Sequence, residues 1–143
     1  MLGATCGVVG VGECGYVDLI SPFVSALHHV LGWVAIYVCG AVGLWGVAMY
    51  RRETLPRAFY PAVGVGVGLM LAQVSLGVAI LATTERHPGD QHTFYGFVIA
   101  FTFAFAYFYK SQFRKRPALA FGLLLLFVMG LGLRGIATYG VNF

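Results

Sequence analysis

The chain alternates between long apolar stretches and short polar segments. Four stretches offer the about 20 mostly apolar residues that a membrane-spanning helix needs, and they cover residues 23–50, 58–83, 91–109 and 117–139. The connections between them are short, so neighbouring helices should run antiparallel. The pattern predicts an all-α, integral membrane protein in which residues 22–143 form a four-helix transmembrane bundle.

Local signals mark the expected helix starts. Pro22 opens the first stretch and Pro117 opens the fourth, and proline is favoured in the first turn of a helix. Asp90 is expected to cap the third helix at its N-terminus. Residues 1–21 are rich in glycine and contain two acidic side chains, which suit a membrane span poorly. We therefore expect an N-terminal segment outside the membrane.

The basic residues predict the orientation of the bundle. Seven of the nine Lys and Arg residues lie in the first and third connections: Arg51, Arg52, Arg57, Lys110, Arg114, Lys115 and Arg116. Short loops that carry Lys and Arg usually stay in the cytoplasm. Both termini are therefore expected on the outer side of the membrane, which we take to be the cell (inner) membrane of a prokaryote.

Composition supports a lipid environment. Apolar residue types make up 59% of the chain and charged types only 10%, whereas a soluble domain has about 25% charged residues. The net charge is +4, but a nucleic-acid-binding protein needs a continuous basic face. The basic residues here cluster in two short connections, so the expected partner is the lipid bilayer and not nucleic acid.

Two histidines near the outer ends of separate stretches are the main candidates for chemistry. His28 precedes Arg51 by about 23 residues and His92 precedes Lys110 by about 18. At a rise of about 1.5 Å per residue, their depths differ by less than about 8 Å. Two neutral imidazoles that face each other from two helices are the ligand set of a bis-histidine haem. Histidines at this depth can also simply contact water or lipid headgroups.

The residue one helical turn after each histidine indicates whether that histidine could bind haem, because a flat macrocycle needs room beside its ligands. Gly32 and Gly96 each follow a histidine by one helical turn. His29 is instead followed at that spacing by Trp33, which leaves less room. The expected ligand in the first stretch is therefore His28. The same glycine spacing also serves ordinary packing between membrane helices.

Short motifs in three stretches resemble one half of the haem A synthase family. They are HHVLG at residues 28–32, QVSLG at residues 73–77, and His92 at the start of the next stretch. The resemblance covers residues 28–109. It implies that His28 and His92 bind haem.

The chain departs from this family at two places near the first histidine. Family members carry an acidic residue about one turn before the first histidine, where this chain has Val24 and Ser25. His29 stands where the family usually has arginine. Cys6 and Cys14 resemble the paired cysteines that some members carry before the first ligand; on the oxidising side of a membrane they could form a disulfide. The resemblance supports haem binding more than haem A synthesis.

These features predict a small b-type cytochrome-like membrane protein that binds one haem b near the outer face for electron transfer. Arg134 is a candidate partner for the propionates. One haem on one side cannot carry electrons across the bilayer alone, so we expect a homo-oligomer or a larger membrane complex, with a quinone as a candidate partner. Two alternatives stay open: a cofactor-free accessory or structural subunit of a respiratory or photosynthetic complex, and a half-size haem A synthase-like enzyme.

Overall fold

The computed structural model describes residues 13–52, 54–83 and 88–142, with side chains from Pro22 onward. Its elements are α1 (Glu13–Ala48), α2 (Phe59–Thr83), α3 (Asp90–Phe108), the 3₁₀ turn η1 (Gln112–Lys115) and α4 (Pro117–Ala137). The described residues contain no β-strand. The prediction of an all-α chain with four helices is therefore confirmed.

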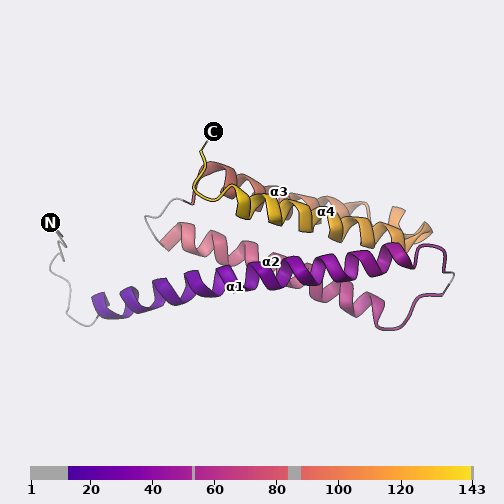
Figure 1. Cartoon of the computed structure of the whole chain (residues 1–143), viewed down its shortest axis with the longest axis horizontal. Helices are drawn as coiled ribbons and strands as arrows, with labels where there is room; N and C mark the ends of the chain where they lie inside the picture. Colours follow the sequence, from indigo (N-terminus) through magenta and orange to yellow (C-terminus); the bar gives the residue numbers. More distant parts are fainter. Residues whose placement is uncertain (1–12, 53, 84–87, 143) are drawn as a thin grey trace.

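The four helices form an antiparallel bundle in which each packs against the next and α4 returns to α1 (Figure 1). α1 is the longest helix and makes its largest contacts with α4 and α2. The contact between α2 and α3 is much smaller. The bundle is therefore closed most tightly around α1 and most loosely between α2 and α3.

Three helical segments among the described residues are long and apolar enough to cross a membrane: Pro22–Ala48, Phe59–Thr83 and Pro117–Ala137. The fourth predicted span, α3, is not among them. Its first turn contains Asp90, Gln91 and His92, and these polar residues lower its mean hydropathy. The three apolar helices indicate a membrane protein.

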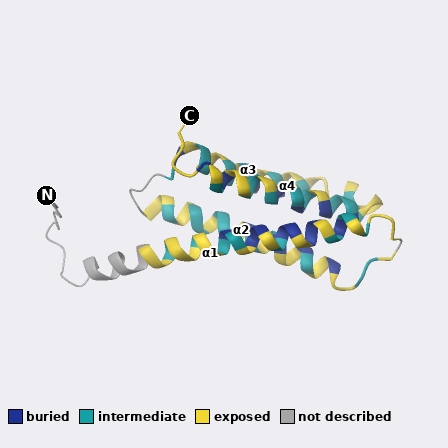
Figure 2. Cartoon of the chain, viewed as in Figure 1, coloured by how far each residue is buried: buried dark blue, intermediate teal, exposed yellow. Residues whose placement is uncertain are grey.

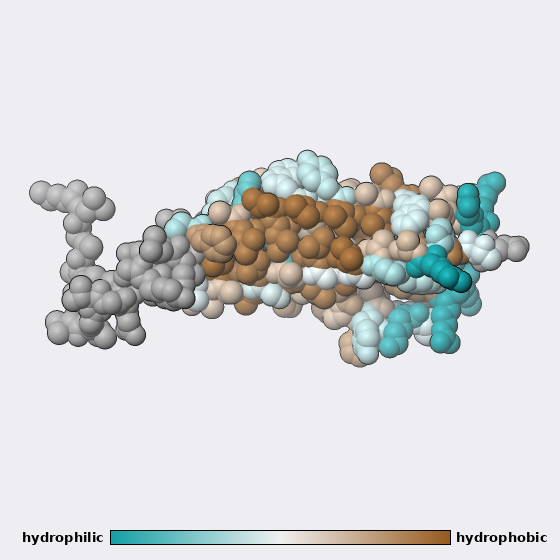
Figure 3. Space-filling view, turned by 90° about the horizontal axis from the view of Figure 1, so that it is seen from below, coloured by the Kyte–Doolittle hydropathy of each residue, from teal (hydrophilic) through white to brown (hydrophobic). Residues whose placement is uncertain are grey.

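Much of the surface of the bundle is apolar, as expected for a membrane protein. A band of apolar residues runs along it, with hydrophilic residues gathered at one end (Figure 3). Large side chains such as Phe97 and Phe108 are 71% and 80% exposed. An apolar surface of this extent is unusual for a soluble monomer, whereas lipid would cover it without cost.

α1 begins earlier than predicted. The helix starts at Glu13 and runs through Pro22, which the sequence pattern had suggested as a first-turn residue. Proline removes one intrahelical hydrogen bond, but membrane helices tolerate it in their interior. The apolar part of the helix still begins at Pro22. The expected limit between an N-terminal segment and the transmembrane domain thus falls within one continuous helix.

The start of α3 also differs from the prediction. Gly89, not Asp90, occupies the N-cap position, and it has a φ of 94°. The C-terminal tail accepts hydrogen bonds from the first N–H groups of α3. The Gln91 N–H donates to the Val141 carbonyl (3.2 Å), and the Asp90 N–H donates to Asn142 Oδ1 (3.1 Å). A Cβ at Gly89 would lie 2.8 Å from the Val141 oxygen. Glycine is therefore required both by the positive φ and by the close approach.

Buried residues concentrate in the C-terminal half of α1 (Figure 2) and along α2 and α4. Glycines let the backbones of α1 and α4 touch. A Cβ at Gly46 would lie 2.7 Å from the Ala118 carbonyl oxygen, and one at Gly122 would lie 2.8 Å from the Val47 nitrogen. Close backbone approach at small residues is a common way for membrane helices to pack.

Candidate functional site

A cavity of about 320 Å³ lies between the four helices at the end of the bundle that carries the histidines. Pockets that hold small molecules and cofactors have volumes of roughly 300–1,000 Å³. Most of the lining is apolar, and a few polar side chains converge on it: His28, Gln73, His92, Thr93 and Tyr139. Residues of all four helices line the cavity.

His28 and His92 meet inside this cavity. Their ring centroids are 6.2 Å apart and their planes are inclined by 71°. His28 comes from α1 and His92 from α3, and these two helices do not pack against each other along their described residues. The two imidazoles therefore approach each other across the interior of the bundle.

The His92 ring is oriented by the backbone of α4. Its Nδ1 lies 2.9 Å from the carbonyl oxygen of Gly135. A carbonyl only accepts hydrogen bonds, so Nδ1 carries a proton and donates it, and in the neutral ring Nε2 is then unprotonated. The ring also contacts Tyr139 edge to face at 5.5 Å between centroids. Histidines that bind metals are typically oriented by a hydrogen bond of this kind from the second ring nitrogen.

His28 is held by an amide of α2. Its Nε2 lies 3.2 Å from Gln73 Nε2, where the amide nitrogen donates and the ring nitrogen accepts. His28 Nδ1 and Gln73 Oε1 are buried and have no hydrogen-bond partner. Leaving a polar group buried in this way costs about 1–3 kcal/mol. The cavity therefore presents polar atoms that a bound ligand could satisfy.

Glycines on α1 and α2 make room for these two side chains. A Cβ at Gly77 would lie 3.0 Å from His28 Cε1, and a Cβ at Gly32 would lie 2.9 Å from Gln73 Nε2. Gly32 was expected to leave room for a macrocycle, but the Gln73 amide occupies that space. Gly96 lines the cavity and has no heavy atom within 4 Å of an added Cβ. The free space therefore lies on the α3 side.

The remaining predicted site residues lie at the rim or outside it. His29 is exposed on α1 and does not line the cavity. Arg134 is also exposed, and its Nε donates to the hydroxyl of Tyr95 (3.4 Å), a residue that lines the cavity. Cys6 and the side chain of Cys14 lie outside the described residues, and with them the predicted disulfide.

Sequence reasoning assigned no role to two groups that hold the histidines. Gln73 had a detectable signal, since an amide within an apolar membrane helix is costly unless it has a partner. The Gly135 carbonyl had none, because every residue has a carbonyl and only the packing of α4 against α3 brings this one to His92.

In the described part of the chain, no group of three or more His, Cys, Asp or Glu side chains gathers as a metal site. No family model matches the chain, and no curated protein or solved structure was found to be significantly similar to it. The resemblance to haem A synthase therefore stays a prediction.

Proposed function

We propose that this chain is a small b-type cytochrome-like membrane protein that binds one haem b between His28 and His92 for electron transfer. The observation that supports this proposal is the approach of the two imidazoles to 6.2 Å within a ligand-sized cavity. A spacing of roughly 6 Å would allow both imidazoles to bind one metal ion, since a metal–nitrogen bond is about 2 Å long.

A plain edge-to-face pair of rings has a similar spacing, so the proposal also rests on the surroundings of the two rings. The helices that carry the rings do not pack against each other, and the rings line a cavity of about 320 Å³ between the four helices. A pair that served packing alone would have no need of such a cavity. Both features favour a ligand between the rings.

The residues around the pair fit a bis-imidazole haem. The Gly135 carbonyl fixes one nitrogen of His92, and in the neutral ring the other nitrogen has a lone pair that can bind a metal. Gly96 leaves open space beside His92, and Ile36, Met70 and Ile99 give the cavity an apolar wall. The haem would supply one-electron redox chemistry, while the chain supplies the ligands and excludes water. If His28 coordinates through Nε2, coordination replaces its hydrogen bond with Gln73.

The proposal includes an orientation and a partner. With the basic connections in the cytoplasm, as the positive-inside rule favours, the histidine cavity lies near the outer face of the cell membrane and both termini are outside. A single haem at that depth cannot pass electrons across the bilayer. The proposed protein therefore works with a second copy, a larger complex or a quinone.

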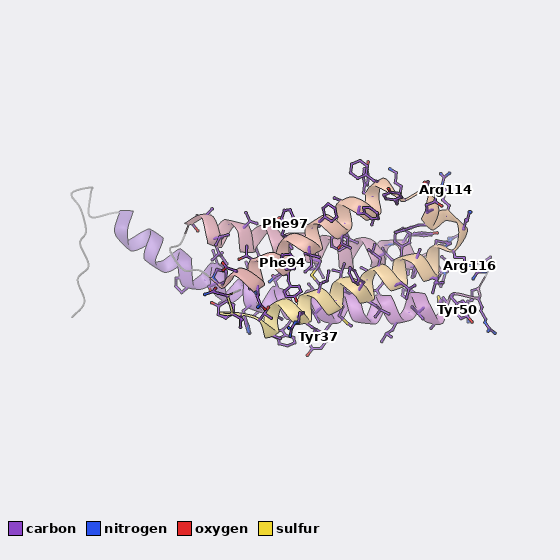
Figure 4. The ribbon with its side chains drawn as sticks, turned by 90° about the horizontal axis from the view of Figure 1, so that it is seen from above. Tyr37, Tyr50, Phe94, Phe97, Arg114 and Arg116 are labelled. Carbon is purple, nitrogen blue, oxygen red and sulfur yellow. The ribbon has the colours of Figure 1, made fainter. Side chains whose placement is uncertain are left out.

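One observation favours a second function. Phenylalanines form an exposed stripe along α3: Phe94, Phe97, Phe101, Phe105 and Phe108. Figure 4 shows Phe94 and Phe97 on this helix. A neighbouring membrane subunit would cover such a stripe, as lipid would. The second candidate is therefore a cofactor-free accessory subunit of a membrane complex.

Substitution of single histidines tests the ligand assignment. His28→Ala and His92→Ala should each lose the haem, measured as the haem-to-protein ratio of purified protein in a pyridine haemochrome assay. His29→Ala is the matched control, because His29 neighbours His28 but lies outside the cavity; it should keep the wild-type ratio. Circular dichroism reports whether each variant is folded. Full haem occupancy in the His92→Ala protein would refute the assignment.

A further inference from the structure

A second cavity lies at the opposite end of the bundle from the histidines. Its volume is about 390 Å³, and four cationic side chains line it: Arg52, Arg114, Lys115 and Arg116. Arg52 follows α1, while the other three lie in η1 and just before α4. Figure 4 shows Arg114 and Arg116 at the same end as Tyr50, and Figure 3 shows hydrophilic residues gathered there. Two connections that are distant in sequence thus bring their charges to one pocket.

The other cations of these connections do not line the pocket. Arg51 lies over the ring of Tyr50, with Cζ 5.2 Å from the centroid, and donates to the Tyr50 hydroxyl. Lys110 Nζ lies 4.1 Å from the centroid of Tyr107. Arg57 does not line the pocket. The pocket is therefore formed by a subset of the basic residues, and the same connections provide cations outside it for comparison.

The N-terminus of α4 adds to the positive potential of the pocket. Arg116 is the N-cap residue and makes no capping hydrogen bond through its side chain. Pro117 and Ala118, the first residues of α4, line the pocket, and Ala118 is only 4% exposed. The first N–H groups of a helix lack intrahelical acceptors and carry the positive end of its dipole; in α4 these groups begin at Ala118, because Pro117 has no N–H. Helix N-termini of this kind bind phosphate and similar anions.

Negative charge at this end is scarce. Among the side chains that the structure describes, the acidic one is Asp90, and it lies at the far end of α3. The first and third connections together contain seven cations and a single carboxylate, that of Glu53. The pocket therefore keeps an excess of positive charge whatever Glu53 contacts.

We propose that this basic pocket binds a phosphate group, either the headgroup phosphate of an anionic phospholipid or the phosphate of a soluble compound. Arginine offers a planar set of donors that matches phosphate oxygens. Tyr50 and Tyr60 line the pocket at the ends of apolar spans, where tyrosines usually mark the headgroup level of a bilayer. Basic pockets between membrane helices are known to bind anionic headgroups.

Native mass spectrometry of the full chain in mild detergent tests the proposal. The protein is titrated with dioleoylphosphatidylglycerol and, separately, with dioleoylphosphatidylcholine. The pocket variant carries Arg52→Gln and Arg114→Gln. The control variant carries Arg57→Gln and Lys110→Gln, and so removes the same charge from the same two connections at positions outside the pocket. Wild type should prefer the anionic lipid, and the pocket variant should lose about fivefold in affinity per cation, while the control variant keeps its affinity.

A second arm distinguishes the two sources of phosphate. Thermal unfolding is followed with inorganic phosphate or glycerol 3-phosphate at equal ionic strength. Stabilisation of wild type but not of the pocket variant, without preference for the anionic lipid, would assign the site to a soluble phosphate compound. Equal lipid affinities in the two double variants, together with no stabilisation by phosphate, would overturn the proposal. Neither variant alters the histidine cavity, so this result is independent of haem.

Discussion

The imidazole of His28 packs over Gly77, where an added Cβ would lie 3.0 Å from Cε1. One turn away along the same pair of helices, the amide of Gln73 packs over Gly32. Because α1 and α2 are antiparallel, each helix offers one polar side chain and, four residues later, the glycine that receives the partner's side chain. The HxxxG segment of α1 thus fits the QxxxG segment of α2. This fit places the side chains of His28 and Gln73 at the cavity.

Valine at Gly77 should push the His28 ring out of position. Overpacking of this kind costs about 1–3 kcal/mol, so we expect Gly77→Val to lower both the free energy of unfolding and the haem occupancy. Gly64→Val on the same helix is the control, since no heavy atom lies within 4 Å of its added Cβ. Reversible unfolding in mixed detergent and SDS compares the two. Equal stabilities would argue against the packing of His28 on Gly77.

Leucine at Gly96 should fill the cavity without disturbing the fold. An added Cβ at Gly96 has no heavy atom within 4 Å, so the side chain can extend into the space beside His92. We expect a strong loss of haem and a change of less than about 1 kcal/mol in the stability of the haem-free protein. Gly130→Leu, at an exposed position of α4 with equally open surroundings, should keep its haem. Full haem occupancy in Gly96→Leu would mean that the haem does not lie on this side.

The contact between α1 and α4 should tolerate no added side chain at Gly122. A Cβ there would lie 2.8 Å from the backbone nitrogen of Val47, and backbone cannot move aside as a flexible side chain can. Gly122→Val should therefore lose at least about 1–3 kcal/mol of stability or fail to yield folded protein. Gly130→Val on the same helix should fold like the wild type. The two variants are compared by yield of monodisperse protein and by unfolding, and similar values would contradict the described packing.

Arg134 should tune the reduction potential if its charge lies near the haem. A cation disfavours the oxidised, more positive form, so removing it should lower the midpoint potential. For a charge about 10 Å away the effect is about 1 kcal/mol, or roughly 40 mV for one electron. Redox titration of Arg134→Gln against Arg57→Gln, which lies in the first connection, measures it. An unchanged potential would remove Arg134 from the proposed site.

Helix positions were predictable because the apolar stretches themselves define them. The stretch predicted at residues 58–83 corresponds to α2 (Phe59–Thr83). The first turns were less predictable. Pro22 lies inside α1 because one lost hydrogen bond does not end a membrane helix, and α3 is capped by Asn142 and Val141, which are far from it in sequence.

The candidate site was also predictable only in part. Counting residues from the basic connections predicted similar depths for His28 and His92, because the rise per residue of a helix is fixed. The partners of these histidines were not predictable. Gln73 and the Gly135 carbonyl reach the rings only because α2 and α4 are rotated to face them, and that rotation is set by packing along the whole bundle.

The most direct test of the central proposal is the reduced-minus-oxidised absorption spectrum of the wild-type protein, purified in mild detergent from cells supplied with haem, with a pyridine haemochrome assay for stoichiometry. We predict a b-type spectrum with about one haem per chain, since one pair of histidine ligands would hold one haem. Folded protein that shows no haem absorption would contradict the proposal and favour the accessory subunit instead.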